Sequence, residues 1–185
     1  MKTTIRIATT ADARFVHDVY GYYVDQTNAT FTTENPPVEE YAHKIEKTLE
    51  MYPFLILETD DVPRGFAYAS QIRPHEAYRW TAEGTVYLAP DAPRRMGLGQ
   101  LIYQKLLDIL REQGIQTVFG VITATNEASI RMHFSMGFEK VGHFGRMGNK
   151  HGEWLDMVWM QKTLNDLSEQ PEPPVPFAGR MLGAQ

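Results

Sequence analysis

The spacing of apolar residues in this chain switches between two periods, and the order of the switches constrains the fold. Apolar residues three and four positions apart predict helices over 11–26, 36–52, 98–112 and 126–136. Short β-rich runs predict strands over 5–8, 54–59, 65–72, 83–89, 116–123, 138–148 and 153–164. Strands and helices in this mixed order predict an α/β or α+β fold, in which helices flank one sheet.

The length and the C-terminal composition predict one domain and a tail. A chain of 185 residues with 43% hydrophobic residues suits one globular domain, which we assign to residues 1–165. The remaining residues 166–185 are rich in Pro and Gly and show no periodicity. We expect this tail to be disordered or draped over the surface.

The composition excludes several classes of function. The net charge of -5 and the pI near 5.7 weigh against a protein that coats nucleic acid or an anionic membrane. Cysteine is absent, which removes disulfides and thiolate chemistry and fits a reducing cytoplasm. No apolar run approaches the roughly 20 residues of a membrane helix, and no histidine pair has the spacing of a metal site. We therefore expect a cytoplasmic protein without a metal.

One predicted turn combines glycines with positively charged residues. Arg94 and Arg95 precede Gly97 and Gly99, between a predicted strand and a predicted helix. Glycine lets a phosphate approach the unpaired N–H groups of a helix N-terminus, and arginines add charge-assisted hydrogen bonds. Neither a Walker A loop nor a three-glycine dinucleotide motif is present. From this motif alone, an anion-binding turn and a tight turn with solvated arginines both remain open.

Longer stretches of the sequence resemble a known enzyme superfamily. Arg94-x-x-Gly97-x-Gly99 resembles the pyrophosphate-binding signature of GNAT-type N-acetyltransferases, and residues 118–142 resemble their second cofactor motif. The stretches AYRWTAEGTVYL, SIRMHFSMGF and KHGEW resemble the phosphinothricin and methionine sulfoximine acetyltransferase branch. The resemblance covers roughly residues 4–163.

The resemblance implies a fold and a cosubstrate. Members of this superfamily bind acetyl-coenzyme A in a mixed sheet that splays open at its centre, here between 83–89 and 116–123. By resemblance, the pantetheine arm pairs with the backbone of the first of these strands and the diphosphate lies on the turn. The implied cofactor-binding residues are Val86, Tyr87, Leu88, Arg94, Arg95, Met96, Gly97, Leu98, Gly99 and Asn126.

Acetyl transfer to an amine requires a base, because an α-amino group holds its proton to a pKa of about 7.7–8. Glu83 opens the central strand and resembles the glutamate assigned as general base in this branch. A strand N–H near Val86 would stabilise the oxyanion of the tetrahedral intermediate. His133 lies where this branch places histidine and other acetyltransferases place a tyrosine acid, which makes it a candidate acid or proton relay. The alternatives are an exposed glutamate and a packed, hydrogen-bonded histidine.

Substrate recognition is expected from the loop before this strand. An amino acid with an anionic side group needs a cation for its carboxylate and donors for its other oxygens. The resemblance adds Phe31 as an aromatic that closes over the substrate. The candidate substrate-binding residues are Phe31, Arg73, His75, Tyr78, Arg79 and Thr85. Two positions depart from the phosphinothricin enzymes, which carry arginine where His75 stands and serine where Gly84 stands.

Together these features predict an enzyme that acetylates the α-amino group of a small amino acid or analogue by direct transfer from acetyl-CoA. Methionine sulfoximine, methionine sulfone and phosphinothricin are the candidate substrates. The alternatives are another amine, such as a polyamine, an aminoglycoside or a peptide N-terminus, and a non-catalytic acetyl-CoA binding module. The resemblance also implies a homodimer, while the net charge implies no nucleic-acid or membrane partner.

Overall fold

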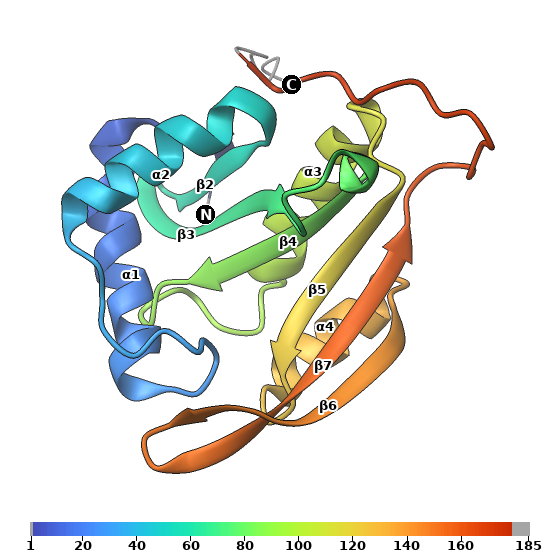
Figure 1. Cartoon of the computed structure of the whole chain (residues 1–185). Helices are drawn as coiled ribbons and strands as arrows, with labels where there is room; N and C mark the ends of the chain where they lie inside the picture. Colours follow the sequence, from blue (N-terminus) through green and yellow to red (C-terminus); the bar gives the residue numbers. More distant parts are fainter. Residues whose placement is uncertain (1, 179–185) are drawn as a thin grey trace.

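The computed structural model describes residues 2–178, and it confirms the predicted order of strands and helices (Figure 1). The strands are β1 (Thr3–Ile7), β2 (Phe54–Thr59), β3 (Val62–Gln71), β4 (Thr81–Leu88), β5 (Thr117–Thr123), β6 (Glu139–Lys150) and β7 (Glu153–Thr163). The helices are α1 (Ala13–Gln26), α2 (Val38–Met51), α3 (Leu98–Glu112) and α4 (Glu127–Ser135), with short 3₁₀ turns η1 (Thr10–Asp12) and η2 (Glu76–Tyr78).

Within residues 2–178 the strands form one seven-stranded sheet in the order β1-β2-β3-β4-β5-β7-β6. Neighbouring strands are antiparallel except β4 and β5, which are parallel. This parallel pairing is short, because it involves only Thr81, Ala82 and Glu83 of β4. Beyond Glu83 the two strands separate, so the sheet opens at its centre, as the family resemblance implied (Figure 1).

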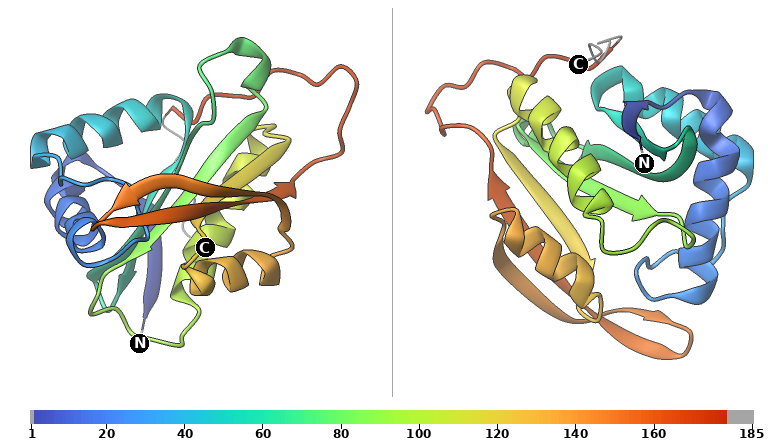
Figure 2. Two further views of the ribbon diagram at one scale, coloured as in Figure 1. Left: turned by 60° about the horizontal axis from the view of Figure 1, so that its bottom comes forward. Right: turned by 180° about the vertical axis from the view of Figure 1, so that it is seen from behind.

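Helices cover both faces of the sheet, and each face has its own apolar core (Figure 2). α1 and α2 pack on one face, against a cluster that includes Phe54 and Ile56. α3 and α4 pack on the other face, where the cluster includes Leu55 and Leu57. Successive side chains of a strand point to opposite faces. The continuous apolar run of β2 therefore serves both cores.

The turn between β2 and β3 is tighter than the sequence predicted. A turn over residues 60–65 was expected, but the chain reverses at Asp60 and Asp61 alone, with φ of 49° and 63°. Positive φ at both central positions is typical of a type I′ hairpin turn, in which aspartate is tolerated. Pro63 consequently falls inside β3, where it pairs with Glu58 next to a bulge at Arg64, and the missing N–H of proline is tolerated at a bulge.

The C-terminal tail is draped over the surface and fixed there (Figure 1). Phe177 is only 1% exposed, and its N–H donates to the Met51 carbonyl at 3.1 Å. Gln113 joins the two segments, because its Nε2 donates to the carbonyls of Met51 and Val175, both at 2.8 Å. Of the two alternatives for the tail, draping therefore holds for residues 166–178, and residues 179–185 lie outside the described part of the chain.

Candidate active site

A cavity of about 240 Å³ lies where β4 and β5 separate. The two strands form its walls, α1 and the loop after it supply Tyr20 and Phe31, and α4 supplies His133. The cavity gathers residues that the sequence analysis had selected from distant segments. They are Phe31, Glu83, Thr85, Val86, Tyr87, Asn126 and His133.

Glu83 lies at the point where the two strands part. It pairs with Phe119 of β5 and lines the cavity. Burial raises the pKa of Glu83 above the usual value, while the positive charges of Lys44 and Arg73 act in the opposite direction. A carboxylate with a raised pKa is a stronger base than an exposed one. The position therefore suits a general base.

His133 is buried, with 3% of its surface exposed, and both ring nitrogens have partners. Nδ1 lies 2.8 Å from the Ser129 carbonyl oxygen, which can only accept a hydrogen bond, so Nδ1 carries the proton. Nε2 is then an acceptor and lies 3.2 Å from the Tyr103 hydroxyl. Burial lowers the pKa of His133, although the Ser129 carbonyl opposes this shift. A neutral imidazole in this arrangement suits a proton acceptor or an orienting group better than an acid.

Tyr103 lies behind the cavity lining, in contact with His133, and was missed in the sequence. Its side chain is fully buried, and its hydroxyl lies 3.3 Å from the Gly84 carbonyl and 3.2 Å from His133 Nε2. A Cβ added at Gly84 would lie 2.5 Å from the Tyr103 hydroxyl, and one added at Gly120 would lie 2.4 Å from His133 Nε2. The two glycines therefore make room for the pair. This explains physically why glycine follows Glu83 in this chain.

The turn of arginine and glycine lies at the other end of β4. Gly97 is the N-cap of α3 with φ 68°, and nothing lies within 4 Å of a Cβ added there. The first N–H groups of a helix have no partner within the helix. Arg94, Arg95 and Met96 are exposed, and Leu98 begins α3. The turn is therefore open to an anion, and it carries the charge to bind one.

Two predicted cofactor contacts have partners within the protein. The Leu88 carbonyl accepts a hydrogen bond from the Tyr23 hydroxyl at 2.8 Å. Asn126 caps α4, because its Oδ1 accepts from the Ser129 N–H at 3.2 Å. Asn126 nevertheless lines the cavity, whereas Leu88 is outside the lining. Of the three β4 residues assigned to pantetheine, Val86 and Tyr87 thus have the more direct access.

The predicted substrate loop lies beside the cavity rather than in its lining. Arg73 is close enough to Glu83 to lower the pKa of that carboxylate. His75 and Tyr78 are exposed, and their ring centroids lie 6.4 Å apart. Arg79 forms an ion pair within the same loop. Arg73 is therefore the loop residue with a clear electrostatic connection to the site.

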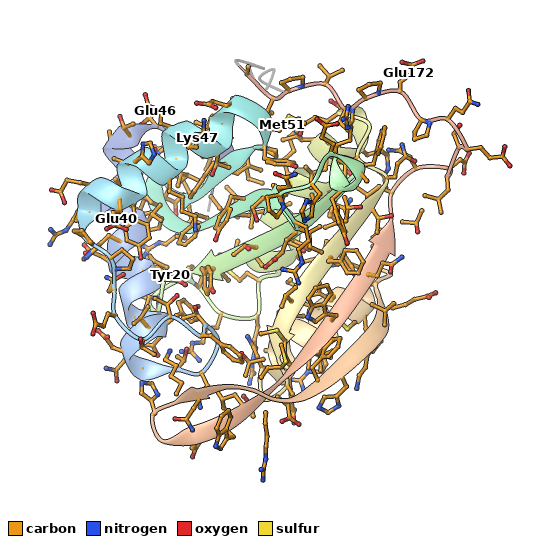
Figure 3. The ribbon with its side chains drawn as sticks, viewed as in Figure 1. Tyr20, Glu40, Glu46, Lys47, Met51 and Glu172 are labelled. Atoms are coloured by element: carbon orange, nitrogen blue, oxygen red, sulfur yellow. The ribbon has the colours of Figure 1, made fainter. Side chains whose placement is uncertain are left out.

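Three further residues on this side were missed. Tyr20 and Tyr68 line the cavity, and Figure 3 shows Tyr20 between α1 and the end of β4. The Lys44 ammonium donates to the Tyr68 hydroxyl at 2.8 Å and lies 4.2 Å from the centroid of that ring. Lys44 also has a larger effect than Arg73 on the pKa of Glu83. The tyrosines at helical spacing in α1 were visible in the sequence, but the same spacing fits a packed core.

Residues 2–178 offer neither a metal cluster nor a membrane span. No group of three or more His, Asp or Glu side chains in that range is placed to hold a metal ion. No helix in the same range is long and apolar enough to cross a membrane.

Comparison with known proteins assigns a family to this geometry. Residues 5–159 match the acetyltransferase (GNAT) domain. The chain belongs to the GNAT acetyltransferase family. This GNAT acetyltransferase is similar to phosphinothricin N-acetyltransferase of Streptomyces viridochromogenes, with 36% identity over 172 residues that cover 93% of this chain and 91% of the relative. It is also similar to the L-methionine sulfoximine/L-methionine sulfone acetyltransferase of Salmonella typhimurium, with 32% identity over 88% of this chain and 95% of the relative.

A solved structure agrees with this assignment. The GNAT superfamily phosphinothricin acetyltransferase from Sinorhizobium meliloti, crystallised in complex with AcCoA, matches this fold with a TM-score of 0.87 and 30% identity. The match covers 96% of this chain and 99% of that one. The resemblance inferred from the sequence motifs is therefore confirmed, and the protein is an N-acetyltransferase of the GNAT fold.

Proposed function

We propose that this GNAT acetyltransferase transfers the acetyl group of acetyl-CoA to the α-amino group of a small amino acid or analogue. The observation that carries the proposal is Glu83, a carboxylate with a raised pKa at the point where β4 and β5 part. The names of two relatives give the candidate substrates, which are phosphinothricin, methionine sulfoximine and methionine sulfone. The similar enzyme from Sinorhizobium meliloti binds acetyl-CoA in its crystal structure, which supports the same acetyl donor here.

The proposed diphosphate site is the turn from Arg94 to Gly99. The open space beside Gly97 and the free N–H groups at the start of α3 fit an anion. Main-chain N–H groups of Met96, Leu98 and the two glycines would hold the diphosphate, and the two arginine side chains would add charge. Val86, Tyr87 and Leu88 would run beside the pantetheine arm, with Asn126 facing them across the opening.

In the proposed reaction Glu83 accepts a proton from the substrate ammonium, directly or through one water molecule. The amine nitrogen then bonds to the acetyl carbon, and a main-chain N–H near Val86 donates to the oxyanion that forms. When this intermediate collapses, the carbon–sulfur bond breaks, the former amine nitrogen loses its extra proton, and the thiolate takes up one proton. Neutral His133, whose Nε2 lies 3.2 Å from the Tyr103 hydroxyl, is proposed to orient the reacting groups and to relay protons in this last step.

We assign substrate recognition to the charges around Glu83. Lys44 and Arg73 both act on this carboxylate, so a substrate carboxylate bound between them would place its own amine near the base. Thr85 and Phe31 line the cavity and would contact the rest of the substrate. His75, Tyr78 and Arg79 lie farther out on the loop, where they are proposed to meet an extended or anionic side group.

The proposal is tested by release of free coenzyme A, followed with a thiol-reactive dye. The chain contains no cysteine, so the protein adds no background to this assay. The substrate panel is methionine sulfoximine, methionine sulfone, phosphinothricin, ordinary amino acids, polyamines and short peptides. We expect saturable release with at least one amino acid analogue. Release with polyamines or peptides alone would contradict the proposed substrate class.

We also propose a homodimer that works in the cytoplasm. β6 is an edge strand and exposes Val141, Phe144 and Met147, which favours pairing with a second copy. The absence of cysteine fits a reducing compartment. Light scattering after gel filtration should give twice the mass of the chain, and the monomer mass would contradict the dimer.

A further inference from the structure

The β6–β7 hairpin carries a lysine whose ammonium group is buried. Lys150 ends β6, and only 3% of its surface is exposed. Its Nζ donates to the carbonyl oxygens of Thr27, Thr30 and Tyr23, at 2.8, 2.9 and 3.3 Å. These three carbonyls match the three N–H donors of an ammonium group. Burial lowers the pKa of Lys150, and Asp25 opposes this shift.

The three acceptors come from the C-terminal end of α1 and the loop that follows it. Carbonyl groups at a helix C-terminus lack partners within the helix and carry partial negative charge, so a cation is stabilised there. Lys150 thereby connects two segments more than a hundred residues apart in sequence. Figures 1 and 2 show the tip of the hairpin beside this loop. A weaker hydrogen bond, from Asn28 to Glu153 at 3.5 Å, joins the same two segments.

Burial of a lysine is unusual in this strand because the apolar residues of β6 are exposed. Of the 12 residues in β6, Lys150 alone is buried. Val141, Phe144 and Met147 are all exposed. The exposed apolar residues of β6 therefore do not anchor this strand to α1. Lys150 does so, through the hydrogen bonds of its ammonium group.

The loop that Lys150 holds leads directly to Phe31, which lines the cavity. Thr30 and Thr32 flank Phe31, and the hydroxyl of each lies 2.7 Å from the Tyr20 hydroxyl. On the hairpin side the Phe31 ring lies against Gly148, because a Cβ added there would be 2.7 Å from two ring carbons. Gly148 and Lys150 are two residues apart on one strand, so they belong to the same face of it.

We propose that Lys150 is a positioning residue for the amine substrate: it holds the 27–31 loop against the hairpin, so that the Phe31 ring forms part of the cavity wall. This inference rests on the proposed function, since it assigns the ring to the amine rather than to acetyl-CoA. The hairpin is then a component of the substrate site, although Glu153 and its neighbours at the tip lie outside the cavity lining.

The test is a double-mutant cycle of Lys150→Met and Phe31→Ala, measured with an amino acid analogue that the wild-type protein acetylates. We expect each single change to raise KM for the amine about tenfold and to leave KM for acetyl-CoA within about twofold. In the Phe31→Ala background, Lys150→Met should raise KM for the amine by less than a further factor of about two, because the ring that Lys150 positions is gone. The matched control is Lys140→Met, an exposed lysine of the same strand, which should change neither constant.

Additive effects of the two changes would overturn the inference, and so would an equal rise in both KM values. If Lys150→Met does not fold, Gly148→Ala replaces it, because the added Cβ displaces Phe31 while Lys150 stays in place; an unchanged KM for the amine would then overturn the inference. Hydrogen exchange gives a readout without substrate: exchange of residues 27–32 should be faster in Lys150→Met, and an unchanged rate contradicts the contact. Failure of the wild-type protein to acetylate any amine refutes the proposed function instead.

Discussion

The two ends of β4 are built from different chemical groups. At the Glu83 end, the cavity and its charged surroundings consist of side chains from separate segments, among them Phe31, Lys44 and Tyr68. At the other end, the turn from Arg94 to Gly99 offers main-chain N–H groups from one continuous segment. A substitution replaces the chemical group of a side chain, whereas it leaves the main-chain N–H groups in place. Substitutions at the first end should therefore act on the amine reaction, and those at the second end on binding of acetyl-CoA.

The largest effect is expected from Glu83→Gln, which removes the proposed base and keeps the shape of the side chain. We expect kcat/KM for the amine to fall about a hundredfold to ten-thousandfold, while the dissociation constant of acetyl-CoA, measured by calorimetry, stays the same. Glu139→Gln, an exposed glutamate at the start of β6, is the control. Turnover that is unchanged at several pH values would remove Glu83 from the role of base.

A smaller effect on the same end is expected from Lys44→Met. If Lys44 binds the substrate carboxylate, KM for the amino acid should rise about tenfold or more, whereas KM for the corresponding carboxamide should hardly change. The control is Lys47→Met, on the outer face of α2 (Figure 3), because Lys47 is exposed and pairs with Glu50. Equal losses for the acid and the carboxamide would assign Lys44 a role other than carboxylate binding.

The main-chain end is tested with Gly97→Val. A β-branched side chain at φ 68° is strained and fills the open space beside the turn, so we expect the dissociation constant of acetyl-CoA to rise about tenfold. KM for the amine at saturating acetyl-CoA should change little. Gly152→Val carries comparable backbone strain in the β6–β7 turn, at φ 80°, and should leave acetyl-CoA affinity intact. Retained affinity in Gly97→Val would contradict the proposed diphosphate site.

The smallest effect concerns pH. Protonation of Glu83 would inactivate the proposed base, so activity should fall as the pH drops through the pKa of Glu83, which burial has raised. Lys44 and Arg73 lower that pKa, so the acidic limb of the kcat/KM profile should move to higher pH in Lys44→Met or Arg73→Met. Salt should weaken the difference, because Lys44 is exposed and its charge is screened. A shift to lower pH would contradict the electrostatic link.

The two ends of β4 also differ in how far the sequence predicts them. The glycines of the turn stand out in the sequence because of their spacing, and Gly97 has the positive φ that favours glycine. Glu83 and His133 were found through motifs that surround them. Lys44 and Lys150 carried no such signal, because their partners, Tyr68 and the Thr27 and Thr30 carbonyls, lie far away along the chain.

The fold was more predictable than the site because its elements are long and periodic. The two cores of the sheet follow from the apolar runs, and the errors fell at turns, where Asp60 and Asp61 reverse the chain in two residues. Tyr103 shows the limit of this reasoning. Its position on α3 reads as one more core residue, and only the approach of Gly84 and His133 reveals that its hydroxyl has two polar neighbours.

The anchoring of Phe177 has a consequence for the way the protein is made. Phe177 packs beside Met51, which precedes it by more than a hundred residues, so the residues around Met51 are synthesised well before the ring that covers them. Domains fold from the N-terminus during synthesis, so α2 and α3 can assemble first with this part of their core open to water. The packing of this part of the core therefore waits until Phe177 has left the ribosome.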